Sequence, residues 1–251
     1  MDFPLTISKT KVKAQYELVV AAAVAKAEIK GFRTGKAPRH LVEPKLDKRQ
    51  LYQTVLEQLL PEFLTALITK YHLHPIATPR LKPISMTETK DWEFTVDIAE
   101  APKIDLGDYK THVTAALRAE KLDKDKRLAK VFDALLTNIK FDLPSLIVAD
   151  ETNKALSKLV DQLQKLGVTL DQYLASVKKT AAALREEYTH TATTNLKLEF
   201  ILQAIAADLK IEVTDADVDA LPQKSQIPAD RTYIKHLLRK RKTIDTLLHL
   251  S

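Results

Sequence analysis

Residues 31–38, Gly-Phe-Arg-Thr-Gly-Lys-Ala-Pro, lie between two long stretches that have helical patterns and contain no glycine. The first stretch, 11–28, repeats small apolar residues at helical spacing, and the second, 48–71, carries a broad apolar stripe. Two of the chain's four glycines lie in the intervening segment, so it is predicted to form a shaped loop. Pro61 lies inside the second stretch and predicts a kink or a junction of two helices.

A small sheet is predicted beside these two helices. Residues 3–7 can form a short strand, and residues 76–86 and 91–99 look extended. The last segment alternates apolar and polar residues from Trp92 onward, which is typical of a strand with one buried face. Residues 87–91 are the predicted hairpin connection. Residues 1–110 are therefore predicted to form an α+β domain.

The remainder of the chain is predicted to be helical. Residues 111–130 are charged and contain no glycine, and we expect them to form a connector. Residues 131–251 are expected to form a mostly α-helical domain, with Thr214 starting a short helix. The predicted helices of this domain cover residues 144–166, 169–177, 180–208 and 229–250. The whole chain is predicted to be predominantly helical and elongated.

Composition narrows the class of protein. Hydrophobic residues make up 45% of the chain and aromatic residues 6%, and there is no cysteine, which excludes disulfides and thiolate chemistry. The N-terminus shows no secretory signal and no stretch can span a bilayer, so we expect a cytoplasmic protein that does not bind membranes. The net charge of +6 is concentrated in residues 30–49 and 231–242, which favours a polyanionic partner.

The side chains of the 31–38 segment suggest how it would bind. Arg33 can contact phosphate or carboxylate with two hydrogen bonds, Lys36 adds a point charge, and Phe32 can enter an apolar slot or stack on a base. A nucleotide-binding P-loop is excluded. The glycines of a P-loop are spaced more widely than Gly31 and Gly35, and Ala37 stands where a P-loop requires a serine or threonine hydroxyl. A purely structural turn between two helices remains open at this point.

A resemblance to a known family favours a binding role for the 31–38 segment over a purely structural turn. The segment Gly31-Phe32-Arg33-x-Gly35-Lys36-x-Pro38 resembles the ribosome-binding signature of bacterial trigger factors. The surrounding sequence is similar to the same family at Leu41-Val42-Glu43, Leu59-Leu60-Pro61-Glu62, Pro75, Pro79 and Ala101-Pro102-Lys103-Ile104-Asp105-Leu106-Gly107-Asp108-Tyr109. Further on, Leu143-Pro144, Leu170-Asp-Gln-Tyr173-Leu174, Leu198-x-Phe200-Ile201-Leu202 and Ile211-Glu-Val-Thr-Asp215 resemble the family's helical C-terminal domain.

The resemblance implies a ribosome-associated chaperone that needs no ATP and no other cofactor. Its partners would be the large ribosomal subunit, through exit-tunnel protein and rRNA, and unfolded nascent polypeptides held in a cradle formed by residues 131–251. A weak homodimer is compatible with it. The implied ribosome-binding residues are Gly31, Phe32, Arg33, Thr34, Gly35, Lys36 and Pro38.

One departure from the family bears on enzymatic activity. The family usually carries a prolyl isomerase domain after the segment that ends at Tyr109, but here only about twenty residues separate Tyr109 from Val131. We therefore expect a protein that is not an enzyme. A prolyl isomerase and a generic basic RNA-binding module remain alternatives.

Two other features stay without a firm assignment. His72 and His74 could contribute to a metal site, but no third ligand is evident and no metal is expected. The basic segment 231–242 is either a second polyanion site or a solvated helix face. Sequence also leaves undecided which apolar residues of the helices between 144 and 208 contact a substrate.

Overall fold

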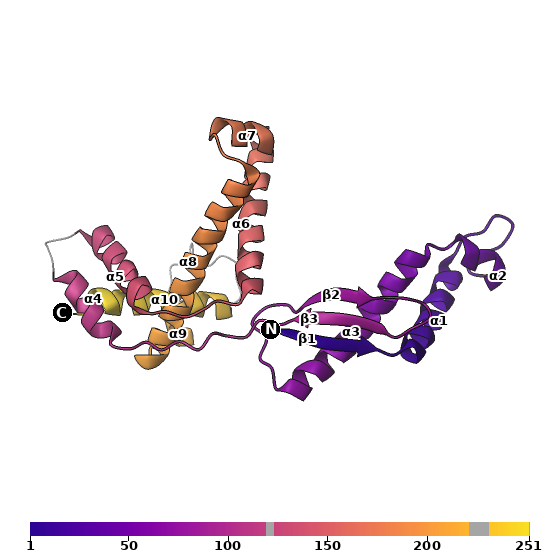
Figure 1. Cartoon of the computed structure of the whole chain (residues 1–251), viewed down its shortest axis with the longest axis horizontal. Helices are drawn as coiled ribbons and strands as arrows, with labels where there is room; N and C mark the ends of the chain where they lie inside the picture. The colour runs from indigo at the N-terminus through magenta and orange to yellow at the C-terminus, as the bar shows by residue number, and fades with distance from the viewer. Residues whose placement is uncertain (119–122, 221–230, 251) are drawn as a thin grey trace. The chain divides into compact units, whose positions relative to one another are not determined.

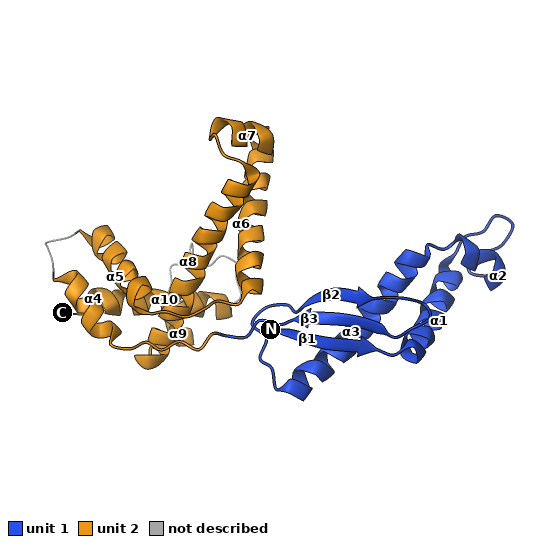
Figure 2. Ribbon diagram, in the orientation of Figure 1, with its two compact units in different colours: residues 1–101 blue, residues 102–251 orange. Residues whose placement is uncertain are grey.

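A computed structural model describes residues 1–118, 123–220 and 231–250 of the chain. It contains two compact units, unit 1 (Met1–Ala101) and unit 2 (Pro102–Ser251), shown in Figures 1 and 2. The division falls before the expected boundary at residue 110, because Tyr109 is buried with the helices of unit 2. An α+β region followed by a mostly helical region is confirmed.

Unit 1 is built on a three-stranded antiparallel sheet in the order β1-β3-β2. The strands are β1 (Asp2–Ile7), β2 (Arg80–Ser85) and β3 (Trp92–Asp97). In the central strand Trp92, Phe94 and Val96 are buried, whereas Glu93 is exposed. The alternation predicted from sequence is therefore present, and it gives the sheet one apolar face that must be covered.

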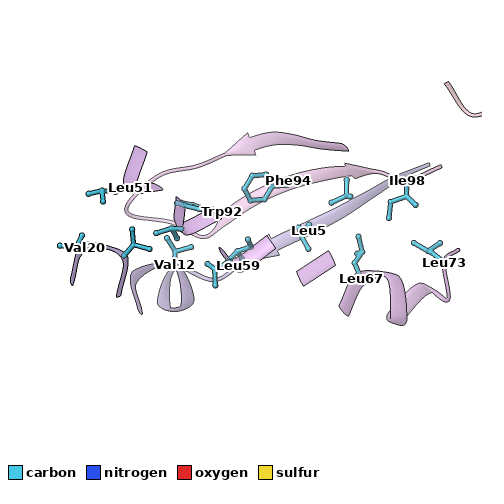
Figure 3. Close-up of a cluster of buried hydrophobic side chains, with 14 residues drawn as sticks. Leu5, Val12, Val20, Leu51, Leu59, Leu67, Leu73, Trp92, Phe94 and Ile98 are labelled. Atoms are coloured by element: carbon cyan, nitrogen blue, oxygen red, sulfur yellow. The ribbon is translucent and has the colours of Figure 1, made fainter. Parts of the chain in front are cut away.

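Two long helices pack against the apolar face of this sheet, α1 (Lys9–Lys26) and α3 (Lys48–Tyr71). Figure 3 shows Leu59 of α3 near Trp92 of the sheet and Leu67 of α3 near Ile98, farther along the same core. A junction of two helices at Pro61 is wrong, because α3 continues through this residue as a single helix. Pro61 is exposed, while Leu59 and Leu67 on either side are buried, so packing holds both halves of α3 against the same core.

Unit 2 has a core of its own. It brings together α4 (Tyr109–Leu117), α5 (Lys124–Asn138), the C-terminal half of α8 (Ala181–Asp208) and α10 (Arg231–Leu248). Two of these helices occupy described parts of the expected connector, and residues 119–122 of that connector lie outside the described residues. Charge in this segment hid the apolar positions that join the core, which are Val113, Leu117 and the partly buried Leu128.

The remaining helices of unit 2 form a hairpin. Helices α6 (Ser145–Lys165) and α8 lie side by side, and α7 (Leu170–Ser176) lies at the far end of the pair (Figure 1). Thr169 forms the expected capping box with Gln172, and Thr214 caps α9 (Asp215–Asp219) in the same way. The expected helix at 229–250 is α10, and residues 229 and 230 lie outside the described residues.

None of the helices in the described ranges combines the length and apolar character needed to cross a bilayer.

Candidate functional site

The 31–38 segment, here called the tip loop, is held by backbone hydrogen bonds at the end of α1. The amide of Gly35 donates to the carbonyl of Ala27 at 3.1 Å, which ties the loop back to the helix. Two tight turns shape the part in between, because Phe32 N donates to Ile29 O at 2.9 Å and Lys36 N donates to Arg33 O at 2.9 Å. The loop therefore has a defined backbone.

Glycine is required where the tip loop approaches α1. Gly35 has a φ of +71°, and a β-carbon built on it would lie 2.3 Å from the carbonyl oxygen of Ala25. Gly31 also has a positive φ, +92°, but a β-carbon added there would have no atom within 4 Å. Glycine is therefore needed at position 35 for both the left-handed backbone and the close contact with α1, whereas at position 31 it is needed for the left-handed backbone alone.

The predicted binding side chains project outward from the tip loop. Phe32 is 44% exposed, and Arg33, Thr34 and Lys36 are exposed as well. Among the described residues, neither Arg33 nor Lys36 forms an ion pair or a side-chain hydrogen bond. A partner can therefore bind these two cations without breaking an ion pair inside the protein.

The base of the tip loop is fixed by one buried residue and a helix start. Ala37 is only 6% exposed and anchors the loop on unit 1. Pro38 precedes α2 (Arg39–Val42) as its N-cap, and α2 leads into the short 3₁₀ helix η1 (Glu43–Lys45). The rigid φ of Pro38 suits this position at a helix start.

Arg39 ties the helix after the loop to the helix before it. Its guanidinium donates from Nη1 to Glu17 of α1 at 2.6 Å and from Nε to Glu43 at 2.7 Å. Hydrogen bonds to Glu43 and then to Glu17 raise the pKa of Arg39, and the same contacts lower the pKa of both carboxyl groups. Arg39 belongs to the basic segment 30–49, but its charge is used within the protein.

The ion-pair cluster around Arg39 was not predicted from the sequence. The spacing of Arg39 and Glu43, four residues apart, is a usable helical signal. Glu17 gives no such signal, because it meets Arg39 only after the chain has turned back through the tip loop.

The second basic segment, 231–242, is different, because its cations contact acids of unit 2. Lys235 lies 3.0 Å from Asp215, and Lys242 lies 2.8 Å from Asp217. Hydrogen bonds from Lys242 and then from Thr214 lower the pKa of Asp217 to about 2. The other paired cations of this segment are Arg231, with Asp215 and Asp219, Lys240, with Glu199, and Arg241, with Asp245. Four of these cations pair with acids of α8 and α9 and Arg241 pairs within α10, so most charges of the segment already have a carboxylate neighbour.

The structure also separates core from surface among the apolar residues of α6 and α8. Leu163, Ile201, Leu202 and Ile205 are buried. Apolar side chains exposed near α7 are Leu166, Leu170 and Val177. A groove of about 480 Å³ between α6 and α8 combines apolar, hydroxyl and charged side chains, including Phe141, Leu143, Val148, Thr189, Arg185 and Lys197. Unit 2 therefore has apolar surface that a loosely bound chain could cover.

The histidine pair has structural roles. His72 adopts a left-handed conformation, with a φ of 51°, as the C-cap of α3. The backbone amide of His74 donates to Glu100 at 2.7 Å. In the described part of the chain, no group of three or more His, Cys, Asp or Glu side chains is arranged to hold a metal ion.

Comparisons with known proteins agree with the sequence resemblance. The family model described as "Bacterial trigger factor protein (TF)" matches residues 1–135, and the one described as "Bacterial trigger factor protein (TF) C-terminus" matches residues 107–249. Trigger factors of Streptococcus pneumoniae, strains Hungary19A-6 and 70585, are each 31% identical over 121 residues, which is 48% of this chain. The chain covers 28% of the length of these relatives.

A solved structure shares the fold. It is described as "Promiscuous Substrate Recognition in Folding and Assembly Activities of the Trigger Factor Chaperone", and the match covers 100% of this chain and 97% of the solved one. The TM-score is 0.65 and the sequence identity is 12%, so the likeness concerns the fold alone.

Proposed function

The chain belongs to the bacterial trigger factor family, and from this premise we propose that it is an ATP-independent chaperone that docks on the large ribosomal subunit and holds unfolded nascent polypeptides. The observation that carries the proposal is the state of the tip loop. Phe32 is exposed on a hydrogen-bonded backbone, beside Arg33 and Lys36, which have no ion-pair partner among the described residues. The site of action would be the cytoplasm.

The chemistry of the tip loop fits a partner made of protein and rRNA. Arg33 can bind a carboxylate or a phosphate with two parallel hydrogen bonds, and Lys36 adds charge without directional demand. Burial of the apolar ring of Phe32 in a pocket at the exit tunnel would stabilise the complex. Because the backbone is already ordered, docking does not require the loop to lose much conformational entropy.

Unit 2 would hold the nascent chain. Its exposed apolar residues, Leu166, Leu170 and Val177, and the groove between α6 and α8 can bind many sequences by burial of apolar area. Such binding is weak and tolerant of sequence. Release follows when the client buries the same apolar surface in its own core, so no nucleotide is required.

We propose that the chain does not catalyse prolyl isomerisation. The two matching family models overlap in residues 107–135, at the position where a prolyl isomerase domain would have to be inserted. A generic RNA-binding role is less favoured, because five cations of the 231–242 segment already contact carboxylates.

The central experiment is cosedimentation with vacant ribosomes. We expect the triple variant Phe32→Ala, Arg33→Ala, Lys36→Ala to lose at least about tenfold in affinity, because it removes the aromatic anchor and both free cations. The matched control is Leu18→Ala, Lys13→Ala, Lys90→Ala, which removes one exposed apolar side chain and two exposed cations of unit 1 outside the loop.

Circular dichroism should show the same helical content in both variants. Equal cosedimentation of the two triple variants would refute the docking role. The holding role is tested separately: the loop variant should still suppress aggregation of an unfolded client without ATP, since unit 2 is unchanged. A proline-limited refolding assay should detect no acceleration by the wild-type chain.

A further inference from the structure

Unit 1 contains a second surface feature, an apolar groove at the start of α3. It has a volume of about 350 Å³ and lies between the first turns of α3 and the connection from β2 to β3. Its apolar lining comes from Tyr52, Leu56, Met86 and Trp92. None of these residues belongs to the tip loop.

The wall of the groove is preformed by packed aromatic rings. Tyr52 stacks on Tyr16 at 4.9 Å between ring centroids and meets Trp92 edge-on at 5.7 Å. The indole Nε1 of Trp92 donates to the carbonyl of Thr87 at 3.2 Å, which fixes the ring. Burial, followed by the charge of Glu88, raises the pKa of Tyr52 to about 12, as expected for a poorly solvated site.

The opposite lip of the groove is adaptable. Met86 is 40% exposed, and its unbranched side chain can adjust to ligands of different shape. A rigid aromatic wall facing a flexible thioether is suited to apolar side chains of more than one type. The groove is large enough for one or two such side chains, not for a folded element.

The rim carries one unpaired charge. Glu88 lies 3.8 Å from Lys48, so this acid already has a cationic neighbour. Arg49, which also lines the groove, is exposed, and its side chain has no ion pair or hydrogen bond with any residue in the described ranges. A ligand with a carboxylate beside its apolar group would satisfy Arg49.

We propose that this groove binds a short unfolded peptide segment in which an aromatic or long aliphatic side chain is followed by an acidic residue. The apolar side chain would lie against Tyr52 and Leu56, beside the buried ring of Trp92, and the carboxylate would pair with Arg49. This site is in unit 1, separate from the apolar surface of unit 2. Its occupancy does not require docking of the tip loop on a ribosome.

The tip loop of a second copy is a less suitable occupant. Its aromatic residue, Phe32, is followed by Arg33, whose charge Arg49 would repel. Charge complementarity therefore favours an acidic segment of a client over the tip loop of a neighbouring molecule.

The sequence provides a probe in the wall of the groove, because Trp92 is the only tryptophan of the chain and its buried ring lies behind the lining. We would titrate the full chain with three capped tetrapeptides, Gly-Phe-Asp-Ser, Gly-Phe-Lys-Ser and Gly-Ala-Asp-Ser, and record Trp92 emission. The Phe-Asp peptide should cause a saturable change. The Phe-Lys peptide should bind at least about fivefold more weakly, and the Ala-Asp peptide should cause no saturable change.

Three variants make the test specific. Met86→Asp should abolish the response, because it places a carboxylate in the apolar lining, and Arg49→Glu should reverse the preference between the Asp and Lys peptides. Lys13→Glu is the matched control, with the same charge change on an exposed residue of α1, and should behave as wild type. An unchanged emission maximum without peptide would show that each variant is folded around Trp92.

The proposal is overturned if the three peptides bind equally, or if Met86→Asp leaves the response intact. It is also overturned if Trp92 emission changes with protein concentration alone, because the groove would then be occupied by a second copy. Ribosome cosedimentation of Arg49→Glu should equal that of wild type. The outcome for this groove is therefore independent of the outcome for the tip loop.

Discussion

Replacing Gly35 by alanine should damage unit 1 more than the same replacement at Gly31. Both glycines have a positive φ, so each substitution incurs the left-handed strain of an L-residue, about 1–2 kcal/mol. At Gly35 the added β-carbon would also lie 2.3 Å from the carbonyl oxygen of Ala25. Relieving that contact must displace the loop and weaken the Gly35–Ala27 hydrogen bond, which adds about 1–2 kcal/mol.

The expected loss in free energy of unfolding is about 1–2 kcal/mol for Gly31→Ala and about 2–4 kcal/mol for Gly35→Ala. Urea denaturation of the full chain, followed by Trp92 fluorescence, reports this loss, because the sole tryptophan is buried in unit 1. Gly35→Ala should also weaken ribosome cosedimentation more than Gly31→Ala does. Equal destabilisation by the two variants would refute the assigned close approach of the loop to α1.

Two further predictions concern charge. The pKa of Asp217, about 2, lies below its ordinary value of 3.8, so its stabilising contribution is complete above pH 3.8 and is lost as the pH falls towards 2. Asp217→Asn should therefore lower the melting temperature of the chain at pH 7 and make little difference near pH 2, whereas Asp161→Asn, an exposed control, should have no effect at either pH. The affinity for ribosomes should depend only weakly on salt. A plot of log affinity against log salt concentration should have a slope of about −1.5 if Arg33 and Lys36 alone contact phosphates. A slope of about −5 or steeper would indicate that the whole 30–49 segment binds RNA.

The sequence was sufficient for features that depend on local pattern. The alternation from Trp92 to Val96, with Trp92, Phe94 and Val96 on one face, predicted β3, and β3 is the central strand on which the core of unit 1 is built. The glycine pair in residues 31–38 predicted a shaped loop, because a left-handed backbone is accessible at low cost mainly to glycine. The capping box at Thr169 was also predictable, since it involves residues three apart.

Features that depend on distant contacts were not predictable in the same way. Pro61 did not interrupt α3, because burial of Leu59 and Leu67 in one core outweighs the missing backbone hydrogen bond. Residues 111–130 were expected to form a connector, but Val113 and Leu117 of α4 join the core of unit 2. In both places tertiary packing decided the local structure.

Which cations are paired also depends on distant contacts, and this pairing bears on function. Segments 30–49 and 231–242 are both strongly basic, but composition does not reveal which cations are already paired. Helix α10 packs beside the acids of α8 and α9, so its cations stabilise the fold. In unit 1, Glu17 and Glu43 both bond Arg39, and these carboxylates do not engage Arg33. Arg39 uses both acids to fasten α2 to α1, whereas Arg33 and Lys36 have no ion-pair partner among the described residues and can bind a partner molecule.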